Sequence, residues 1–97
     1  MYRNKKLTQF ARDRACTLRI PGVCDGGGET SVWAHSNSQR HGKGMGIKAH
    51  DIFGCIACHG CHQWLDTSHE LKYDKEALFR EAWERSLIEA ANAGVLG

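Results

Sequence analysis

Several features that define other protein classes are missing from this sequence. No apolar run approaches the ~20 residues that a membrane span requires. The basic start, residues 1–6, leads into Leu7-Thr8-Gln9-Phe10 rather than into an apolar signal core. There is no internal repeat, low-complexity tract or interdomain linker, and 41% hydrophobic residues argue against disorder. These absences predict one cytoplasmic domain, residues 1–97, with no membrane partner.

Acidic residues are scarce in the first half of the chain. Residues 1–48 carry nine Lys and Arg but three Asp and Glu, a net charge of +6, whereas residues 49–97 carry a net charge of −4. A basic half suits a polyanionic partner such as DNA. Solvated surface charge would give the same pattern, so charge alone leaves both interpretations open.

Cysteine is abundant, with five in 97 residues. An odd number without an export signal favours metal binding over a disulfide framework. Cys58 and Cys61 form a C-x-x-C pair with Gly60 between them, which supplies two thiolates for a tetrahedral zinc ion. Cys16 and Cys24 are the natural remaining ligands, although they can also be buried small hydrophobes. A four-cysteine site would contribute much of the folding free energy of so small a domain.

Two other interpretations of the cysteines need consideration. Cys55 forms a second C-x-x-C with Cys58, but the glycine turn lies between Cys58 and Cys61, so Cys55 is expected to be a strand residue. Residues 58–62 also match C-x-x-C-H, the attachment pattern of c-type haem. Haem attachment occurs in exported proteins and would leave Cys16 and Cys24 unexplained, so zinc is favoured.

The apolar periodicity predicts a small α+β domain. The expected elements are a basic helix over 5–14, a short strand around Leu18 and Ile20, a strand over 30–35, a glycine-punctuated loop over 36–50, a strand over 51–57, a short helix over 58–66, and a scaffold helix over about 74–93. Long loops in compact domains are usually functional or disordered. This loop lacks the helix context of a P-loop, which excludes a nucleotide site of that kind.

The C-terminal helix is the clearest element in the sequence. Asp74 is expected to cap it, and Gly94 is expected to end it. Apolar residues that recur every four positions are expected to form its buried face, namely Phe79, Trp83, Leu87 and Ala91.

The histidines complete a pattern that resembles the HNH (ββα-metal) endonucleases. That family places a histidine at the end of one strand, an Asn or Asp in the second, and a metal-binding histidine on the following helix. Here His35, Asp51 and His62 take those places, framed by the cysteine pairs. The resemblance implies a small zinc-stapled ββα-metal (HNH-like) domain of class α+β, with its core over 14–66, a short N-terminal helix and a longer C-terminal helix.

A narrower resemblance, over residues 10–66, is to the small prophage-encoded YbcO-type nucleases. The stretches that carry it are Arg14-Ala15-Cys16, Arg19-Ile20-Pro21-Gly22-Val23-Cys24, Glu29-Thr30-Ser31-Val32, Ala34-His35, Gly44-Met45-Gly46-Ile47-Lys48, Asp51 and Ile56-Ala57-Cys58-x-x-Cys61-His62.

The resemblance implies a role for each site residue. His35 would act as general base, and His62 with Asp51 would hold Mg²⁺ or another divalent ion beside the scissile phosphate. Basic side chains would neutralise the phosphate charge, namely Lys48, Arg40 and Lys43. Structural roles are the alternatives: a surface position for His62, a buried hydrogen-bonded one for His35, and a turn cap for Asp51.

One position departs from the family pattern. Many HNH enzymes carry an acid or a second histidine directly before the base, where it binds the metal, whereas this chain has Ala34. Either His62, Asp51 and solvent complete the metal site, or His35 is itself a ligand, and Asn37 or His50 then enters the site.

Two functional hypotheses follow. The first is a metal-dependent DNA endonuclease of phage or prophage origin. The second is a catalytically inactive zinc module that binds DNA, RNA or a phage recombination protein; it would need the cysteines but not the second metal site.

Overall fold

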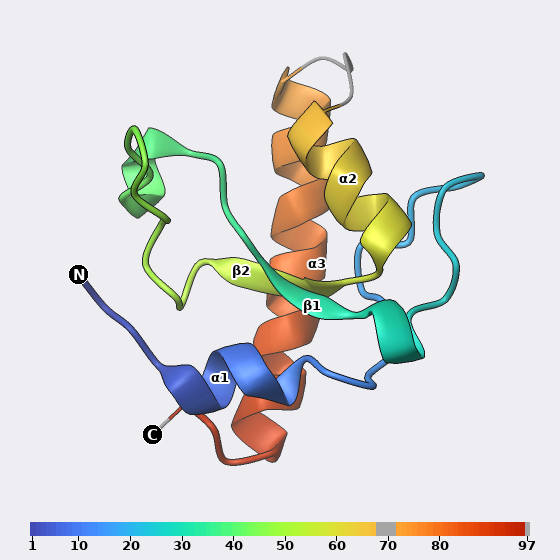
Figure 1. Ribbon diagram of the computed structural model, residues 1–97, viewed down its shortest axis with the longest axis horizontal. Helices are drawn as coiled ribbons and strands as arrows, with labels where there is room; N and C mark the ends of the chain where they lie inside the picture. Colours follow the sequence, from blue (N-terminus) through green and yellow to red (C-terminus); the bar gives the residue numbers. More distant parts are fainter. Residues whose placement is uncertain (68–71, 97) are drawn as a thin grey trace.

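The computed structural model describes residues 1–67 and 72–96, with a small antiparallel sheet at its centre (Figure 1). Strands β1 (Val32–His35) and β2 (Gly54–Ala57) pair in a register that runs from Val32 opposite Ala57 to His35 opposite Gly54. The helices that surround them are α1 (Lys5–Phe10), α2 (His59–Thr67) and α3 (Lys72–Asn92), with short 3₁₀ turns at η1 (Gly28–Thr30) and η2 (Gln39–His41). This order confirms the α+β class.

The sheet packs between the helices. In Figure 1, α3 crosses behind the sheet, while α1 and α2 lie on either side of β1. Every residue of β2 is buried. Gly54 is required at the start of β2, because a Cβ there would collide with the indole ring of Trp33. That indole donates its Nε1 hydrogen to the carbonyl of Asp51, 2.8 Å away, and so fixes the chain just before β2.

The C-terminal helix begins at Lys72, two residues earlier than the sequence indicates. The expectation that Asp74 caps this helix was therefore wrong, because Asp74 lies within its first turn. The expected end was correct. Gly94 adopts φ +74°, a left-handed conformation that suits a helix terminus, and the next residue, Val95, donates back to Ala90 over 3.1 Å.

The buried face of α3 differs from the predicted one. Phe79 is buried as expected and Trp83 and Leu87 are half-buried, but Ala91 is exposed. The fully buried positions of α3 that follow Phe79 in the sequence are small residues, namely Ala82, Ser86 and Ala90. A strict four-residue repeat drifts around a helix of 3.6 residues per turn, so the buried stripe follows spacings of three and four. Small side chains on this stripe let α3 approach β2 closely.

The strand expected around Leu18 and Ile20 is absent. Both side chains are buried, but neither residue belongs to a strand. Arg19 between them adopts φ +54°, which breaks an extended chain. The basic helix is also shorter than expected and ends at Phe10, and Asp13 nearby has φ +63°.

None of the described helices is both long and apolar enough to span a membrane.

Candidate functional site

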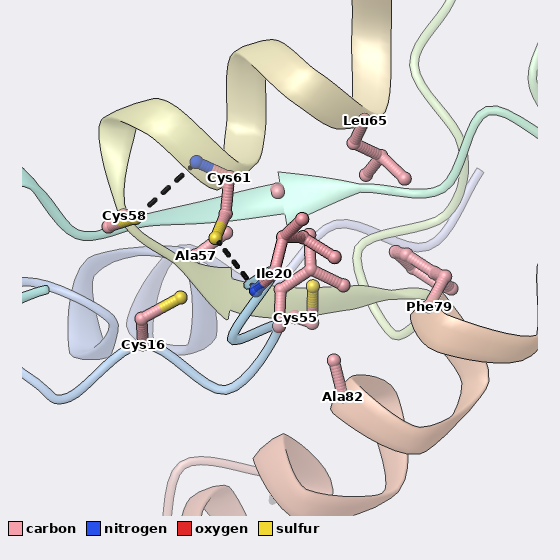
Figure 2. Close-up of a cluster of buried hydrophobic side chains, with 11 residues drawn as sticks. Cys16, Ile20, Cys55, Ala57, Cys58, Cys61, Leu65, Phe79 and Ala82 are labelled. Atoms are coloured by element: carbon pink, nitrogen blue, oxygen red, sulfur yellow. Dashed lines mark hydrogen bonds between the residues drawn. The ribbon is translucent and has the colours of Figure 1, made fainter. Parts of the chain in front are cut away.

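The four cysteines Cys16, Cys24, Cys58 and Cys61 meet at one point of the fold. Their sulfur atoms all lie within 4.8 Å of one another, and the Cys24 and Cys58 sulfurs are 4.0 Å apart. A tetrahedron of thiolates ~2.3 Å from zinc has sulfurs ~3.8 Å apart, so this spacing is close to that of a metal site. Figure 2 shows the Cys16 and Cys61 side chains pointing into the same space beside Cys58. The cluster can therefore hold a metal ion.

Two glycines allow the cysteine-bearing segments to approach. Gly27 has φ +90°, and a Cβ on it would collide with the backbone nitrogen of Cys16. Gly60, between Cys58 and Cys61, lies so close to the preceding turn that a Cβ would come 2.7 Å from the carbonyl oxygen of Val23. The turn that contains Cys24 thus sits directly against the first turn of α2.

Backbone N–H groups point at the sulfur atoms. The Ile20 amide donates to Cys61 Sγ at 3.4 Å, the Gly26 amide to Cys24 Sγ at 3.3 Å, and the Cys61 amide to Cys58 Sγ at 3.4 Å. Such donors stabilise negative charge on sulfur and orient metal ligands. The arrangement suits thiolates rather than neutral buried thiols.

The ionisation of the cluster is uneven without a metal. Burial alone would raise the pKa of Cys16, but backbone hydrogen bonds from Arg19 and Cys58 outweigh it and lower the pKa. Burial raises the pKa of Cys24 and of Cys61. Several thiols in one small space cannot all ionise unaided, whereas a cation among them would remove that penalty.

Cys55 lies outside this cluster. It sits in β2 opposite Ala34, as the prediction of a strand residue required, and it is completely buried. Burial raises the pKa of its thiol to about 12, so the side chain is neutral. Figure 2 places it among the apolar side chains of the core.

The sequence-predicted residues His35 and Asp51 are hydrogen-bonded to each other. His35 ends β1, Asp51 lies just before β2, and His35 Nε2 is 2.7 Å from Asp51 Oδ1. Burial would raise the pKa of the Asp51 carboxyl, but hydrogen bonds from His35, the Asn4 backbone and Arg3 outweigh it and lower the pKa. Because a carboxylate only accepts, Nε2 carries a proton and Nδ1 is left as the basic nitrogen.

The other donors to Asp51 come from the N-terminus. Arg3 Nη1 donates to Oδ1 at 3.0 Å, and the Asn4 amide donates to Oδ2 at 2.6 Å. Both carboxylate oxygens therefore have protein partners. Sequence reasoning missed Arg3 and Asn4, since nearly fifty residues separate them from Asp51 and no local motif links the two segments. His50, considered above as a further ligand, accepts the Tyr2 amide at Nδ1 over 2.9 Å.

A broad groove of about 990 Å³ runs over β1 and contains all three predicted catalytic residues, His35, Asp51 and His62. Its walls come from α1, from the loop between β1 and β2, and from α2. Five basic side chains line it: Arg3, Lys5, Arg12, Lys43 and Lys48. Arg40 instead lines a neighbouring pocket beside α3. The groove thus combines two histidines with a cationic lining that can accept a polyanion.

His62 meets a carboxylate that sequence reasoning did not select. His62 Nε2 is 3.3 Å from Asp66 Oδ2, one turn further along α2, and both side chains line the groove. Asp66 Oδ1 accepts a hydrogen bond from the Asn37 side chain at 2.9 Å. The i,i+4 spacing on the predicted helix over 58–66 was the signal that could have identified Asp66. An imidazole and a carboxylate at this spacing are suitable ligands for a divalent cation.

One family model and two curated relatives match this chain. The family model described as "Putative nuclease YbcO" matches residues 5–95. Two curated relatives, "Putative nuclease YbcO" of Escherichia coli (strain K12) and "Putative nuclease ybcO" of Enterobacteria phage 82, are each 47% identical over 60 residues. In both cases the alignment spans 62% of this chain and 62% of the relative.

The fold is also similar to a solved structure. "Structure of a putative bacteriophage protein from Escherichia coli str. K-12 substr. MG1655" superposes with a TM-score of 0.68 and 33% sequence identity. The match covers 89% of this chain and 96% of the solved one.

Replacing one cysteine of the cluster should abolish metal binding. We expect the purified chain to carry about one zinc per molecule and Cys61→Ser to carry almost none, with a melting temperature lower by at least 10 °C, since a structural zinc contributes much of the stability of a small domain. Elemental analysis and thermal unfolding provide the measurements. Cys55→Ser is the matched control and should keep its zinc. The prediction would be contradicted if removing zinc from the wild-type protein left its melting temperature unchanged.

Proposed function

The chain belongs to the YbcO family, and from this premise we propose that it is a metal-dependent endonuclease of phage or prophage origin that hydrolyses phosphodiester bonds in DNA. The observation that carries the proposal is the groove. It holds a hydrogen-bonded His35–Asp51 pair, a His62–Asp66 pair and a cationic lining. Hydrolysis of a phosphodiester needs a base, a positive centre beside the phosphate and a surface that accepts a polyanion.

The order of the elements supports an HNH-like (ββα-metal) assignment. The chain runs from β1 through β2 directly into α2. His35 stands at the end of β1, and His62 and Asp66 stand on α2. The proposed base and the proposed metal ligands thus belong to one short ββα unit, and all three residues line the same groove.

His35 serves as the general base in this proposal. Its Nε2 donates to Asp51, so Nδ1 keeps its lone pair, and within residues 1–67 and 72–96 Nδ1 has no hydrogen-bond partner. Nδ1 can accept a proton from a water molecule that attacks phosphorus. The Asp51 carboxylate, held ionised by Arg3 and Asn4, stabilises the imidazolium that results.

His62 and Asp66 are the proposed ligands of the catalytic divalent ion. This assignment moves the acidic ligand from Asp51 to Asp66, because the Asp51 side chain is only 7% exposed and accepts hydrogen bonds from His35, Arg3 and the Asn4 backbone. The His62 and Asp66 side chains are 38% and 44% exposed, so an ion can reach them. Mg²⁺ commonly keeps several waters and takes one or two protein ligands plus phosphate oxygens. Bound here, it would polarise the phosphate and stabilise the leaving oxygen.

The basic side chains of the groove supply sequence-independent affinity. Lys43 and Lys48 line it on the loop side, and Lys5 on α1 and Arg12 in the turn after α1 line the other side. Their affinity for DNA should fall steeply with salt, since each phosphate contact releases counterions. Arg40 lies outside the groove wall and has no phosphate role in this proposal.

Zinc is the proposed occupant of the cysteine cluster, with a structural role. Four sulfur ligands close the coordination shell, as in structural rather than catalytic zinc sites. The alternative function is a catalytically inactive zinc module that binds DNA, RNA or a phage recombination protein. Ala34 favours it, because it supplies no metal ligand before His35.

Loss of the proposed base should abolish cleavage. We expect zinc-loaded protein with Mg²⁺ or Mn²⁺ to nick supercoiled plasmid, and His35→Ala to reduce the rate by about 10²–10⁴-fold, the usual contribution of general-base catalysis. His59→Ala is the matched control, because His59 is an exposed histidine at the start of α2. If both variants cleave at the wild-type rate, His35 is not the base. If no metal supports cleavage by the wild-type protein, the inactive module becomes the better account.

Replacing each of two aspartates by asparagine should separate metal binding from orientation of the base. Asp66→Asn should raise the Mg²⁺ concentration needed for half-maximal cleavage by about tenfold or more, because it removes a ligand. Asp51→Asn should lower the maximal rate and leave the Mg²⁺ requirement unchanged. Metal titrations of the cleavage rate measure both effects. The reverse pattern, with Asp51→Asn shifting the Mg²⁺ dependence, would return the acidic ligand to Asp51.

A further inference from the structure

The loop between β1 and β2 carries a tight turn with an apolar tip. Gly44 and Ile47 exchange two backbone hydrogen bonds of 3.0 and 3.1 Å, and Gly46 has φ +69°, which closes the turn. Met45 at the tip is 101% exposed, and Ile47 is 50% exposed. Figure 1 shows this loop projecting to one side of the sheet, away from α3.

Burial does not explain why the residue at the tip is apolar. A fully exposed methionine contributes nothing to the core, and the reciprocal hydrogen bonds hold it out in a defined turn. The tip also lies beside the proposed reaction centre, since Lys43, Gly46, Ile47 and Lys48 all line the same groove as His35. Two lysines thus flank two exposed apolar side chains at the edge of a cationic groove.

We propose that Met45 and Ile47 form a wedge that inserts between neighbouring base pairs of duplex DNA. The inference rests on the proposed nuclease function and specifies its substrate as a duplex that is kinked on binding. Proteins that kink DNA commonly insert Met, Ile, Leu or Phe between base steps, with cationic side chains on the adjacent phosphates. Lys43 and Lys48 supply those cations, and unstacking brings the backbone of the kinked strand toward His35.

The size and charge of the tip favour DNA over a protein partner. A stable protein interface buries about 800 Å² on each side, which is far more than two side chains can offer. A single base step, by contrast, is opened by one or two apolar side chains. The flanking lysines match a phosphate backbone on both sides of the inserted residues.

The experiment measures base unstacking separately from cleavage. His35→Ala protein is mixed with short duplexes that carry 2-aminopurine at successive positions, and fluorescence reports unstacking. We expect a rise on binding that is lost when Met45→Ala and Ile47→Ala are combined. Affinity for the duplex should fall about tenfold, while affinity for the single strand stays unchanged, since only the duplex has stacked pairs to open. Ile88→Ala is the matched control, because Ile88 is an exposed apolar residue on α3.

Each outcome bears on the wedge in a defined way. A fluorescence rise that persists in the double variant, equal losses for duplex and single strand, or no rise at any position would overturn it. Cleavage by the wild-type protein without a fluorescence rise would refute the wedge and leave the nuclease proposal intact. A tip-dependent rise without cleavage would support the wedge and refute the nuclease proposal.

Discussion

The meeting of four cysteine sulfurs is the constraint on which the rest of the structure depends. Cys16 and Cys24 come from irregular segments that form no strand, and Cys58 and Cys61 come from the junction of β2 and α2. Leu18 and Ile20 anchor the segment between Cys16 and Cys24 in the core, and Gly27 and Gly60 leave room for the cysteine-bearing turns to come together. A metal among the sulfurs would therefore fix where α2 begins and in which direction it runs. Because His62 and Asp66 lie on α2, the same constraint sets one wall of the groove.

A second, independent network positions the opposite side of the groove. The Asp51 carboxylate joins His35, Arg3 and Asn4, and its backbone joins Tyr2 and Trp33. One buried acid thus ties the N-terminus to the end of β1 and the start of β2. In the proposed account the two networks have separate tasks: the cysteines place the metal-binding helix, and Asp51 orients the base. Loss of one should leave the local geometry of the other largely intact.

Local patterns in the sequence predicted the parts of the structure that local chemistry determines. The C-x-x-C turn, the two strands, the short helix after them and the glycine end of α3 all follow from neighbouring residues. The grouping of Cys16 and Cys24 with Cys58 and Cys61 was also correct, because few other partners were available. Two failures are local: the positive φ of Arg19 breaks the strand expected around Leu18 and Ile20, and α3 begins at Lys72, before the expected cap at Asp74. The other failures involve tertiary contacts. Arg3 and Asn4 reach Asp51 across the length of the first half of the chain, and the buried face of α3 is decided by how closely β2 approaches it. Asp66 is the exception, because its i,i+4 spacing from His62 is a local signal that the sequence contains.

We propose that the chain holds two different metals in two separate places. Crystals of zinc-loaded protein soaked in Mn²⁺ would test it, with anomalous difference maps collected on both sides of the zinc absorption edge. We expect a zinc peak at the centre of the four cysteine sulfurs and a manganese peak between His62 Nε2 and the Asp66 carboxylate. A map with no zinc among the sulfurs, or with manganese bound at Asp51 and absent from Asp66, would contradict it.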